Sequence, residues 1–272
     1  IWRVCQFRHA RAAPTLASGP TIHGMARVLM PVPDRDCDVT EVAVPWRVLT
    51  RAGHTVTFTT EHGDVVPTAD PRLVDGVIFG QLGAAPEPLA FYADLVKSPQ
   101  WCTPVPWGTL DVTAYDGLIL PGGHAPGMRQ YLGSAALREQ VAAFWALGRP
   151  VGAICHGVLV LARTQGEDGH SLLHGRRTTC LPAYLERSAY FATAWKLGRY
   201  YRTYPAYVET EVRGALARRD DFERGPFVVS ARGTDTDDSA AFVVRDGRYL
   251  SARWPGDAYA FAKAFLTLLP PD

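Results

Sequence analysis

The sequence has 272 residues, of which 47% are hydrophobic and 20% charged, and its formal net charge is +1. This length can bury a full core, and the near-neutral charge gives no reason to expect nucleic acid or an anionic membrane surface as a partner. No apolar run approaches the roughly 20 residues that span a bilayer. The five cysteines, at positions 5, 37, 102, 155 and 180, lack the C-x-x-C spacing of zinc sites. We expect reduced thiols in a cytoplasmic protein, with no metal and no cofactor.

The first 24 residues differ from the rest of the chain. They are rich in Arg and Ala, follow neither helical nor strand periodicity, and lack the apolar segment of a signal peptide. We therefore expect residues 1–24 to be a non-native or disordered extension, and residues 25–272 to form a single domain.

From Met25 onward, predicted strands alternate with predicted helices. This alternation indicates a doubly wound, mostly parallel α/β sheet flanked by helices. The predicted strands are 26–32, 54–60, 115–123, 150–155 and 175–182, followed by a hairpin at 242–252. The predicted helices are 38–53, 88–98, 134–148, 157–165, 183–198 and 256–269.

Residues 67–114 are less regular and contain many Pro and Gly residues. Apart from the helix at 88–98, this segment has no clear periodicity, and "WCTPVPW" at 101–107 is predicted to be exposed. We expect an inserted lid beside the sheet.

The stretch "PVGAICHGVLVL" at 150–161 places Cys155 and His156 between a buried strand and a helix. Reactive groups in open α/β sheets gather at the carboxyl ends of strands, and a helix N-terminus lowers the pKa of a thiol placed there. A second strand ends at Gly122 and Gly123, whose backbone amides can approach a substrate oxygen closely. The combination predicts a nucleophilic cysteine beside an oxyanion site.

"AICHG", following "LILPGGHAPGM" and with Glu41 in the first helix, resembles the ThiJ/PfpI superfamily over residues 26 to 268. That superfamily has the flavodoxin-like, class I glutamine amidotransferase-like fold. The resemblance implies that Cys155 is the nucleophile at a sharp turn and that Glu41 hydrogen-bonds its sulfur. The amides of Gly123 and His156 would form the oxyanion site, with Gly122 in the same turn.

The third catalytic partner separates the branches of this superfamily. Amidotransferases use a late His-x-Glu, whereas this chain has no histidine after His174. The Parkinson-associated human members place a histidine after a later strand, where Cys180 or Leu181 stands here. The heat-shock glyoxalase/chaperone branch uses the His beside the Cys and a later acid, which would be His156 and Glu186. Glu186 would then fix the tautomer of His156.

A polar-aromatic cluster lies downstream, in "LGRYYRTYPAYVETEV" and "SARWPGDA". Aromatic side chains are usually core and arginines are usually exposed or paired with acids. The alternative is a substrate-binding wall, for which we name His124, Tyr201, Arg202, Arg253 and Trp254. Cys37 and Cys180 are interpreted as structural.

The resemblance implies a cysteine-dependent enzyme acting on a small molecule, and specifically a glyoxalase III-like conversion of an α-oxoaldehyde to a hydroxy acid. Two alternatives stay open. One is a hydratase or hydrolase of an isocyanide or amide metabolite, and the other is a non-enzymatic chaperone or oxidation sensor. The resemblance also suggests a homodimer, because members of the superfamily often pair.

Overall fold

The computed structural model describes residues 25–77, 83–202, 204–228 and 230–270. The extension predicted at residues 1–24 lies outside them. No helix in these ranges is long and apolar enough to cross a membrane. Among the described residues, Cys37, Cys102, Cys155 and Cys180 form no disulfide, and Cys5 falls outside them.

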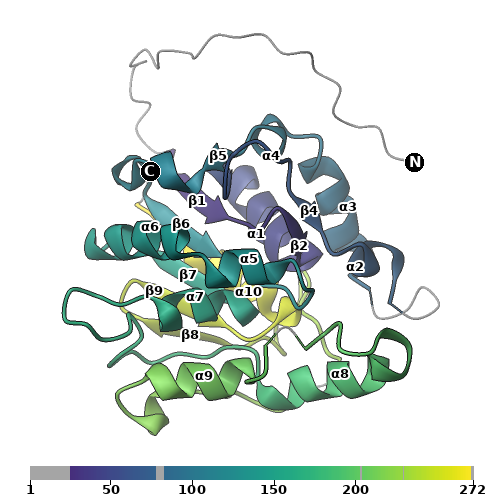
Figure 1. Cartoon of the computed structure of the whole chain (residues 1–272). Helices are drawn as coiled ribbons and strands as arrows, with labels where there is room; N and C mark the ends of the chain where they lie inside the picture. The colour runs from purple at the N-terminus through teal and green to yellow at the C-terminus, as the bar shows by residue number, and fades with distance from the viewer. Residues whose placement is uncertain (1–24, 78–82, 203, 229, 271–272) are drawn as a thin grey trace.

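A seven-stranded sheet forms the centre of the described fold (Figure 1). Its strands are β1 (Arg27–Pro31), β3 (Thr55–Thr60), β5 (Val105–Pro106), β6 (Gly117–Leu120), β7 (Val151–Ile154), β8 (Val243–Asp246) and β9 (Tyr249–Ala252). Their order is β5-β3-β1-β6-β7-β9-β8, and neighbours are parallel except β8 and β9. A second, two-stranded parallel sheet pairs β2 (Arg35–Cys37) with β4 (Thr68–Ala69). The mostly parallel sheet and the hairpin at its edge confirm the prediction.

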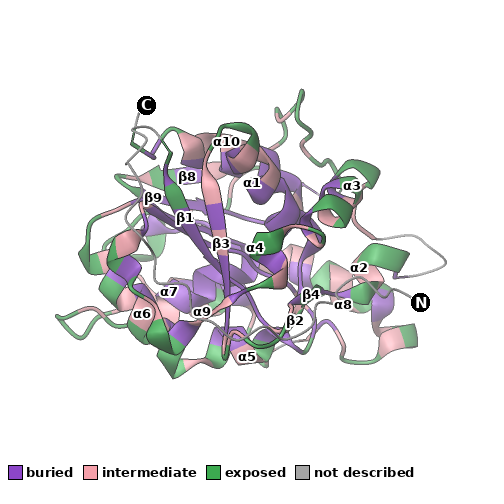
Figure 2. Ribbon diagram, turned by 90° about the horizontal axis from the view of Figure 1, so that it is seen from above, coloured by how far each residue is buried: buried purple, intermediate pink, exposed green. Residues whose placement is uncertain are grey.

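Helices cover both faces of the sheet (Figures 1 and 2). One layer contains α1 (Val39–Arg51), α3 (Pro86–Leu95) and α10 (Ala258–Leu266), and the other contains α5 (Met128–Gly133), α6 (Ala135–Ala146), α7 (Val158–Arg163) and α9 (Val208–Ala215). The remaining helices are α2 (Pro71–Asp75), α4 (Pro99–Cys102) and α8 (Ala183–Leu197). Because both faces are covered, β6 and β7 are buried along their whole length, which is why their sequences are continuous apolar runs.

The strand predicted at 175–182 does not form. Both edges of β9 are occupied, by β7 on one side and β8 on the other, so this segment cannot pair with β9, and it does not pair with the outer edge of β8 either. It instead makes an isolated bridge between Thr178 and Phe222, and the Thr179 amide donates to the side chain of Ser251 at 2.9 Å.

The two tryptophans of the segment 101–107 are buried, contrary to the predicted exposure, whereas Thr103 between them is exposed. Trp101 is 0% exposed and Trp107 is 1% exposed, because Trp101 packs edge-on against Phe58 of β3 and β5 extends the sheet beyond β3. In the earlier part of the expected lid, Leu73 and Ala84 line a cavity that is described below. A lid over 67–114 stays a prediction.

Candidate active site

Cys155 lies at a sharp turn between β7 and α7, where the chain adopts a positive φ of 57°. Among the described residues only Asp36 shares this property outside glycine. A positive φ is costly for a side-chain-bearing residue, and such strain persists where the surroundings hold the turn in place. Gly157 permits it: a Cβ there would lie 2.1 Å from the carbonyl oxygen of Leu120. The predicted turn is therefore present, and it presents the sulfur at the carboxyl end of the sheet.

Glu41 reaches this sulfur from the first turn of α1. Asp38 caps the helix, accepting the amide protons of Thr40 at 2.8 Å and Glu41 at 3.0 Å. The Glu41 carboxyl hydrogen-bonds the Cys155 thiol, and its Oε2 accepts the amide proton of Gly122 at 2.8 Å. The structure thus brings Glu41 and Cys155 together, as the sequence resemblance implied.

Burial raises the pKa of both members of this pair. For Glu41 the negative charge of Asp38 adds to the effect of burial, and for Cys155 the carboxyls of Glu41 and Asp38 add to it. The lowered thiol pKa expected from the helix N-terminus is wrong, because α7 has only six residues and Cys155 is 2% exposed. Instead, the two groups share protons as a pair. A protonated Glu41 carboxyl can donate to the sulfur when the thiol ionises.

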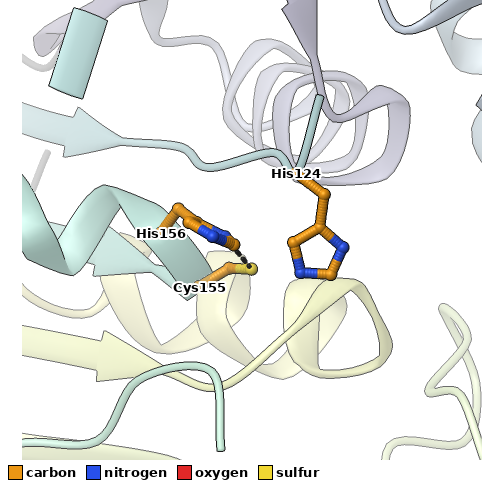
Figure 3. A group of neighbouring side chains, drawn as sticks. All are labelled: His124, Cys155 and His156. Atoms are coloured by element: carbon orange, nitrogen blue, oxygen red, sulfur yellow. Dashed lines mark hydrogen bonds between the residues drawn. The ribbon is translucent and has the colours of Figure 1, made fainter. Parts of the chain in front are cut away.

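Two imidazoles flank the sulfur (Figure 3). Nδ1 of His156 lies 3.6 Å from Sγ of Cys155, and the rings of His156 and His124 meet edge-to-face with their centroids 4.7 Å apart. Burial lowers the pKa of His124 to about 4, and burial, followed by the charges of His124 and Arg163, lowers the pKa of His156 well below its ordinary value. Both rings are therefore neutral at pH 7, and each offers a nitrogen lone pair next to the sulfur.

The predicted oxyanion site is smaller than expected. The Gly122 amide donates to Glu41, so it does not serve a substrate oxygen, which corrects its predicted role. The His156 amide hydrogen-bonds the Cys155 sulfur and stabilises its ionised form. A Cβ at Gly122 would lie 2.7 Å from the His156 nitrogen, which shows how closely the two turns approach. Gly123 and His156 remain the predicted donors to an oxyanion.

Glu186 is engaged away from His156. Its Oε2 accepts the amide proton of Val208 at 3.0 Å, and its Oε1 lies 3.5 Å from the guanidinium of Arg202. Burial raises the pKa of Glu186 to about 7, against the opposing effects of Val208 and Arg202. In the described residues no hydrogen bond joins Glu186 to His156, so the predicted role in orienting that imidazole finds no contact to support it.

Glu186 instead belongs to a reciprocal pair of helix caps. Val208 is the first residue of α9, and Ala183 is the first residue of α8. Glu186 of α8 accepts the Val208 amide, while Glu209 of α9 accepts the Ala183 amide at 2.9 Å. The residues before the two helices, Pro182 and Tyr207, provide no side-chain cap, so each helix supplies the acceptor that the other lacks.

The two arginines predicted to bind substrate have structural roles. Arg253 is 0% exposed and forms a two-point ion pair with Asp257, with both N···O distances 2.8 Å. Arg202 stacks over the ring of Tyr207, 4.1 Å from its centroid, and pairs with Glu186. Neither lines the cavity beside the site, which corrects both assignments. Arg253 thus pairs with an acid four residues further along the chain, and Arg202 pairs with an acid on α8.

The other three predicted substrate-binding residues do line a cavity of about 330 Å³. His124 lines this cavity and packs edge-on against Tyr201, with their ring centroids 5.7 Å apart. The same imidazole lies beside the Cys155 sulfur (Figure 3). Trp254 forms another part of the wall, and α8 contributes side chains such as Leu185 and Ala189. Most of the lining is apolar, as in small-molecule sites generally.

Sequence reasoning missed several lining residues. Thr40 immediately precedes Glu41 and could have been inferred from that position. Arg232, whose guanidinium lies over the Trp254 ring at 5.5 Å, comes from a loop without a recognisable pattern. The wall from α8 consists partly of small residues such as Ala189 and Ala192, which carry no chemical signal in a sequence.

The chain is similar in sequence or in fold to several known proteins. An uncharacterized protein of Schizosaccharomyces pombe is 25% identical over 256 residues, covering 91% of this chain and 85% of that protein. A deglycase of Pyrococcus abyssi is 30% identical over 155 residues, which are 57% of this chain and 63% of that protein. The crystal structure of glyoxalase III from Candida albicans has a TM-score of 0.61 at 17% identity, covering 91% of this chain and 98% of that chain.

The glyoxalase III likeness shows the fold and confirms the predicted α/β architecture. A family model described as ThiJ/PfpI family-like matches residues 32–226, a span that contains Glu41, the Gly122-Gly123 turn and Cys155. This match covers more than half of the sequence. The chain therefore belongs to the ThiJ/PfpI-like family.

Proposed function

We propose that this protein is a cysteine-dependent enzyme that converts an α-oxoaldehyde to a 2-hydroxy acid without a cofactor. The observation that carries the proposal is the strained turn at Cys155, with Glu41 hydrogen-bonded to the sulfur and His156 beside it. A thiol held in this way, with a proton-accepting group on each side, has the arrangement that covalent catalysis on a carbonyl requires.

The chemistry begins with addition of the Cys155 sulfur to the aldehyde carbon, while the thiol proton passes to the aldehyde oxygen. The product is a hemithioacetal. The amides of Gly123 and His156 would stabilise the negative charge that develops on the aldehyde oxygen during the addition. The neutral imidazole of His156 then takes the C1 proton and returns it to C2, while the proton of the C1 hydroxyl passes to the C2 oxygen. C1 is thereby oxidised to a thioester and C2 reduced to an alcohol, so no external oxidant is needed. Water hydrolyses the thioester and restores the thiol.

The cavity supports a substrate larger than the smallest oxoaldehyde. About 330 Å³ of mostly apolar space adjoins His124, and Trp254 and Leu185 form part of its wall. Burial of apolar surface there would favour a substituent such as a phenyl ring or an alkyl chain at about 25 cal/mol per Å² removed from water. Phenylglyoxal is therefore expected to have a lower KM than methylglyoxal.

The decisive experiment measures 2-hydroxy acid formation from both aldehydes with purified wild-type protein, Cys155→Ser and Cys102→Ser. Cys102 is a partly exposed thiol in α4 and controls for nonspecific thiol chemistry. We expect lactate and mandelate from the wild type and from Cys102→Ser, and none from Cys155→Ser. Absence of both acids with the wild-type protein would refute the proposal.

A second activity, removal of the same aldehydes from glycated amines or thiols, is favoured by the similarity to the Pyrococcus abyssi deglycase. It shares the attack by Cys155 but begins from an adduct rather than a free aldehyde. The two are separated by comparing adduct loss with the spontaneous rate of adduct dissociation. Loss no faster than spontaneous dissociation indicates action on the free aldehyde alone, whereas faster loss indicates direct attack on the adduct.

A further inference from the structure

Three side chains with metal-binding atoms converge beside the cavity. One donor atom from each of His124, Cys155 and His156 lies within 4.8 Å of the other two. In Figure 3 the sulfur lies between the two imidazole rings, with His124 approaching from the loop after β6 and His156 from the turn after β7. Sequence spacing did not reveal this set, because two separate strand ends contribute to it.

The distances fit a tetrahedral zinc-like ion with modest adjustment. With Zn–S of about 2.3 Å and Zn–N of about 2.0–2.1 Å, adjacent sulfur and nitrogen ligands lie about 3.5 Å apart. Sγ of Cys155 and Nδ1 of His156 are 3.6 Å apart, so these two atoms already have the separation of adjacent zinc ligands. Since no separation in the set exceeds 4.8 Å, completing the site requires an approach of about 1 Å by the His124 ring.

The donor set also selects the class of metal. A thiolate with two imidazoles suits Zn²⁺ or Cu⁺, whereas Mg²⁺ and Ca²⁺ prefer oxygen ligands. We propose that His124, Cys155 and His156 bind one thiophilic transition-metal ion per chain, with Zn²⁺ as its representative. Binding replaces the S–H bond by an S–Zn bond, and the released proton passes to solvent. Three protein ligands leave the fourth position of a tetrahedral site for water or another ligand.

This site goes beyond the proposed function and does not depend on it. The metal and a carbonyl substrate would use the same lone pair on Cys155, so an enzyme with bound metal would be unable to form the hemithioacetal. Metal binding is measured without substrate, and acid formation is measured in the presence of a chelator. Failure of one proposal therefore leaves the other standing.

The test uses Co²⁺ and Zn²⁺ as probes with the full chain. For the wild type we expect one equivalent of Co²⁺ to give a thiolate-to-cobalt charge-transfer band, and Zn²⁺ in stoichiometric amount to abolish it. Cys155→Ser should lose the band. His124→Ala should weaken Zn²⁺ affinity, measured by competition with a chromophoric chelator, at least about tenfold, the loss typical for removing only an outer-shell partner.

Surface binding is controlled by the double variant His170→Ala/His174→Ala. These exposed rings stack with centroids 4.3 Å apart and form the kind of pair that captures metals adventitiously. We expect this variant to bind Co²⁺ as the wild type does. A band that persists in Cys155→Ser, or affinity that is unchanged in His124→Ala, would overturn the site. X-ray absorption at the zinc edge of the wild type, expected to show one sulfur and at least two nitrogen ligands, tests it without any substitution.

Discussion

Glu41 hydrogen-bonds the thiol of Cys155 while its Oε2 holds the amide of Gly122. The contact with Gly122 is structural, whereas the contact with Cys155 allows proton exchange. The substitution Glu41→Gln separates these two roles. Gln keeps an acceptor for Gly122 but cannot exchange a proton as an acid does. We expect kcat/KM to fall about 100-fold, a typical cost of losing a proton-transfer group, with no fall in Tm.

The comparison for this prediction is Glu41→Ala, which removes the acceptor as well. The buried Gly122 amide would then lack its partner, and we expect a loss of about 1–3 kcal/mol of unfolding free energy in addition to the loss of activity. Thermal unfolding and steady-state kinetics measure the two effects. Wild-type activity in Glu41→Gln would show that proton sharing with Cys155 is not required.

Glu186 provides a pH-dependent prediction. Its pKa rises from 4.5 to about 7 on folding, so between these values the folded state binds more protons than the unfolded state. The contribution of Glu186 to stability is therefore greatest below pH 4.5 and is lost as pH rises through 7, by on the order of 3 kcal/mol. Glu186→Gln keeps an acceptor for Val208 but does not ionise. Its Tm relative to wild type should rise from pH 4.5 to pH 8.

Activity in the same variants distinguishes a helix cap from a catalytic acid. We expect Glu186→Gln to keep wild-type kcat at pH 7, and Glu186→Ala to lose about 2 kcal/mol, lowering Tm by roughly 5 °C. If Glu186→Gln loses activity while its Tm is unchanged, then Glu186 does act on His156 during the reaction.

The size of the cavity is tested on α8. Ala189→Phe places a ring into the space that Ala189 now borders, so KM for phenylglyoxal should rise more than KM for methylglyoxal. Phe191→Ala is the matched control, because Phe191 lies on the same helix but is 66% exposed and does not line the cavity. Equal effects of Ala189→Phe on the two substrates would place the substituent elsewhere.

Neighbouring residues 253 and 254 should respond in opposite ways to substitution. Arg253→Met leaves the carboxylate of Asp257 buried without its cation, so we expect a cost of about 3–5 kcal/mol with little change in KM. Trp254→Leu should raise KM for phenylglyoxal, because the indole forms part of the cavity wall. Thermal unfolding and kinetics of the two variants check this division. A rise in KM with unchanged Tm for Arg253→Met would restore its predicted substrate role.

The parts of the site predicted from sequence are those held by local chain geometry. Cys155 and the Gly122-Gly123 turn follow strands that are apolar throughout, and Glu41 lies in a helix whose start Asp38 marks. Because parallel strands end at one edge of the sheet, these groups had to lie near one another. Local pattern was sufficient to place Cys155 and the glycine turn, whereas the pairing of Glu41 with the sulfur was implied by the resemblance to the ThiJ/PfpI superfamily.

The parts that sequence did not predict depend on distant partners. Glu186 and Val208 meet only because α8 and α9 lie beside each other, and the buried Arg253 donates to the carbonyl of Pro226, 27 residues away, as well as to Asp257 in the next turn. The segment containing Thr178 has a strand-like composition, yet it bridges Phe222 and does not join the sheet. Composition describes which structure a segment favours, whereas the structure that forms also depends on which segments lie beside it in the fold.

The reciprocal caps have a mechanical consequence. They tie the start of α8, which forms one cavity wall, to the start of α9, and Glu211 of α9 is joined to Arg163 of α7 through two hydrogen bonds of 2.5 and 2.9 Å. Since α7 follows directly after the turn at Cys155, hydrogen bonds connect the α8 wall through α9 and α7 to the turn that holds the sulfur. A bulky substrate that displaces α8 would therefore also displace α7 and the turn that positions Cys155.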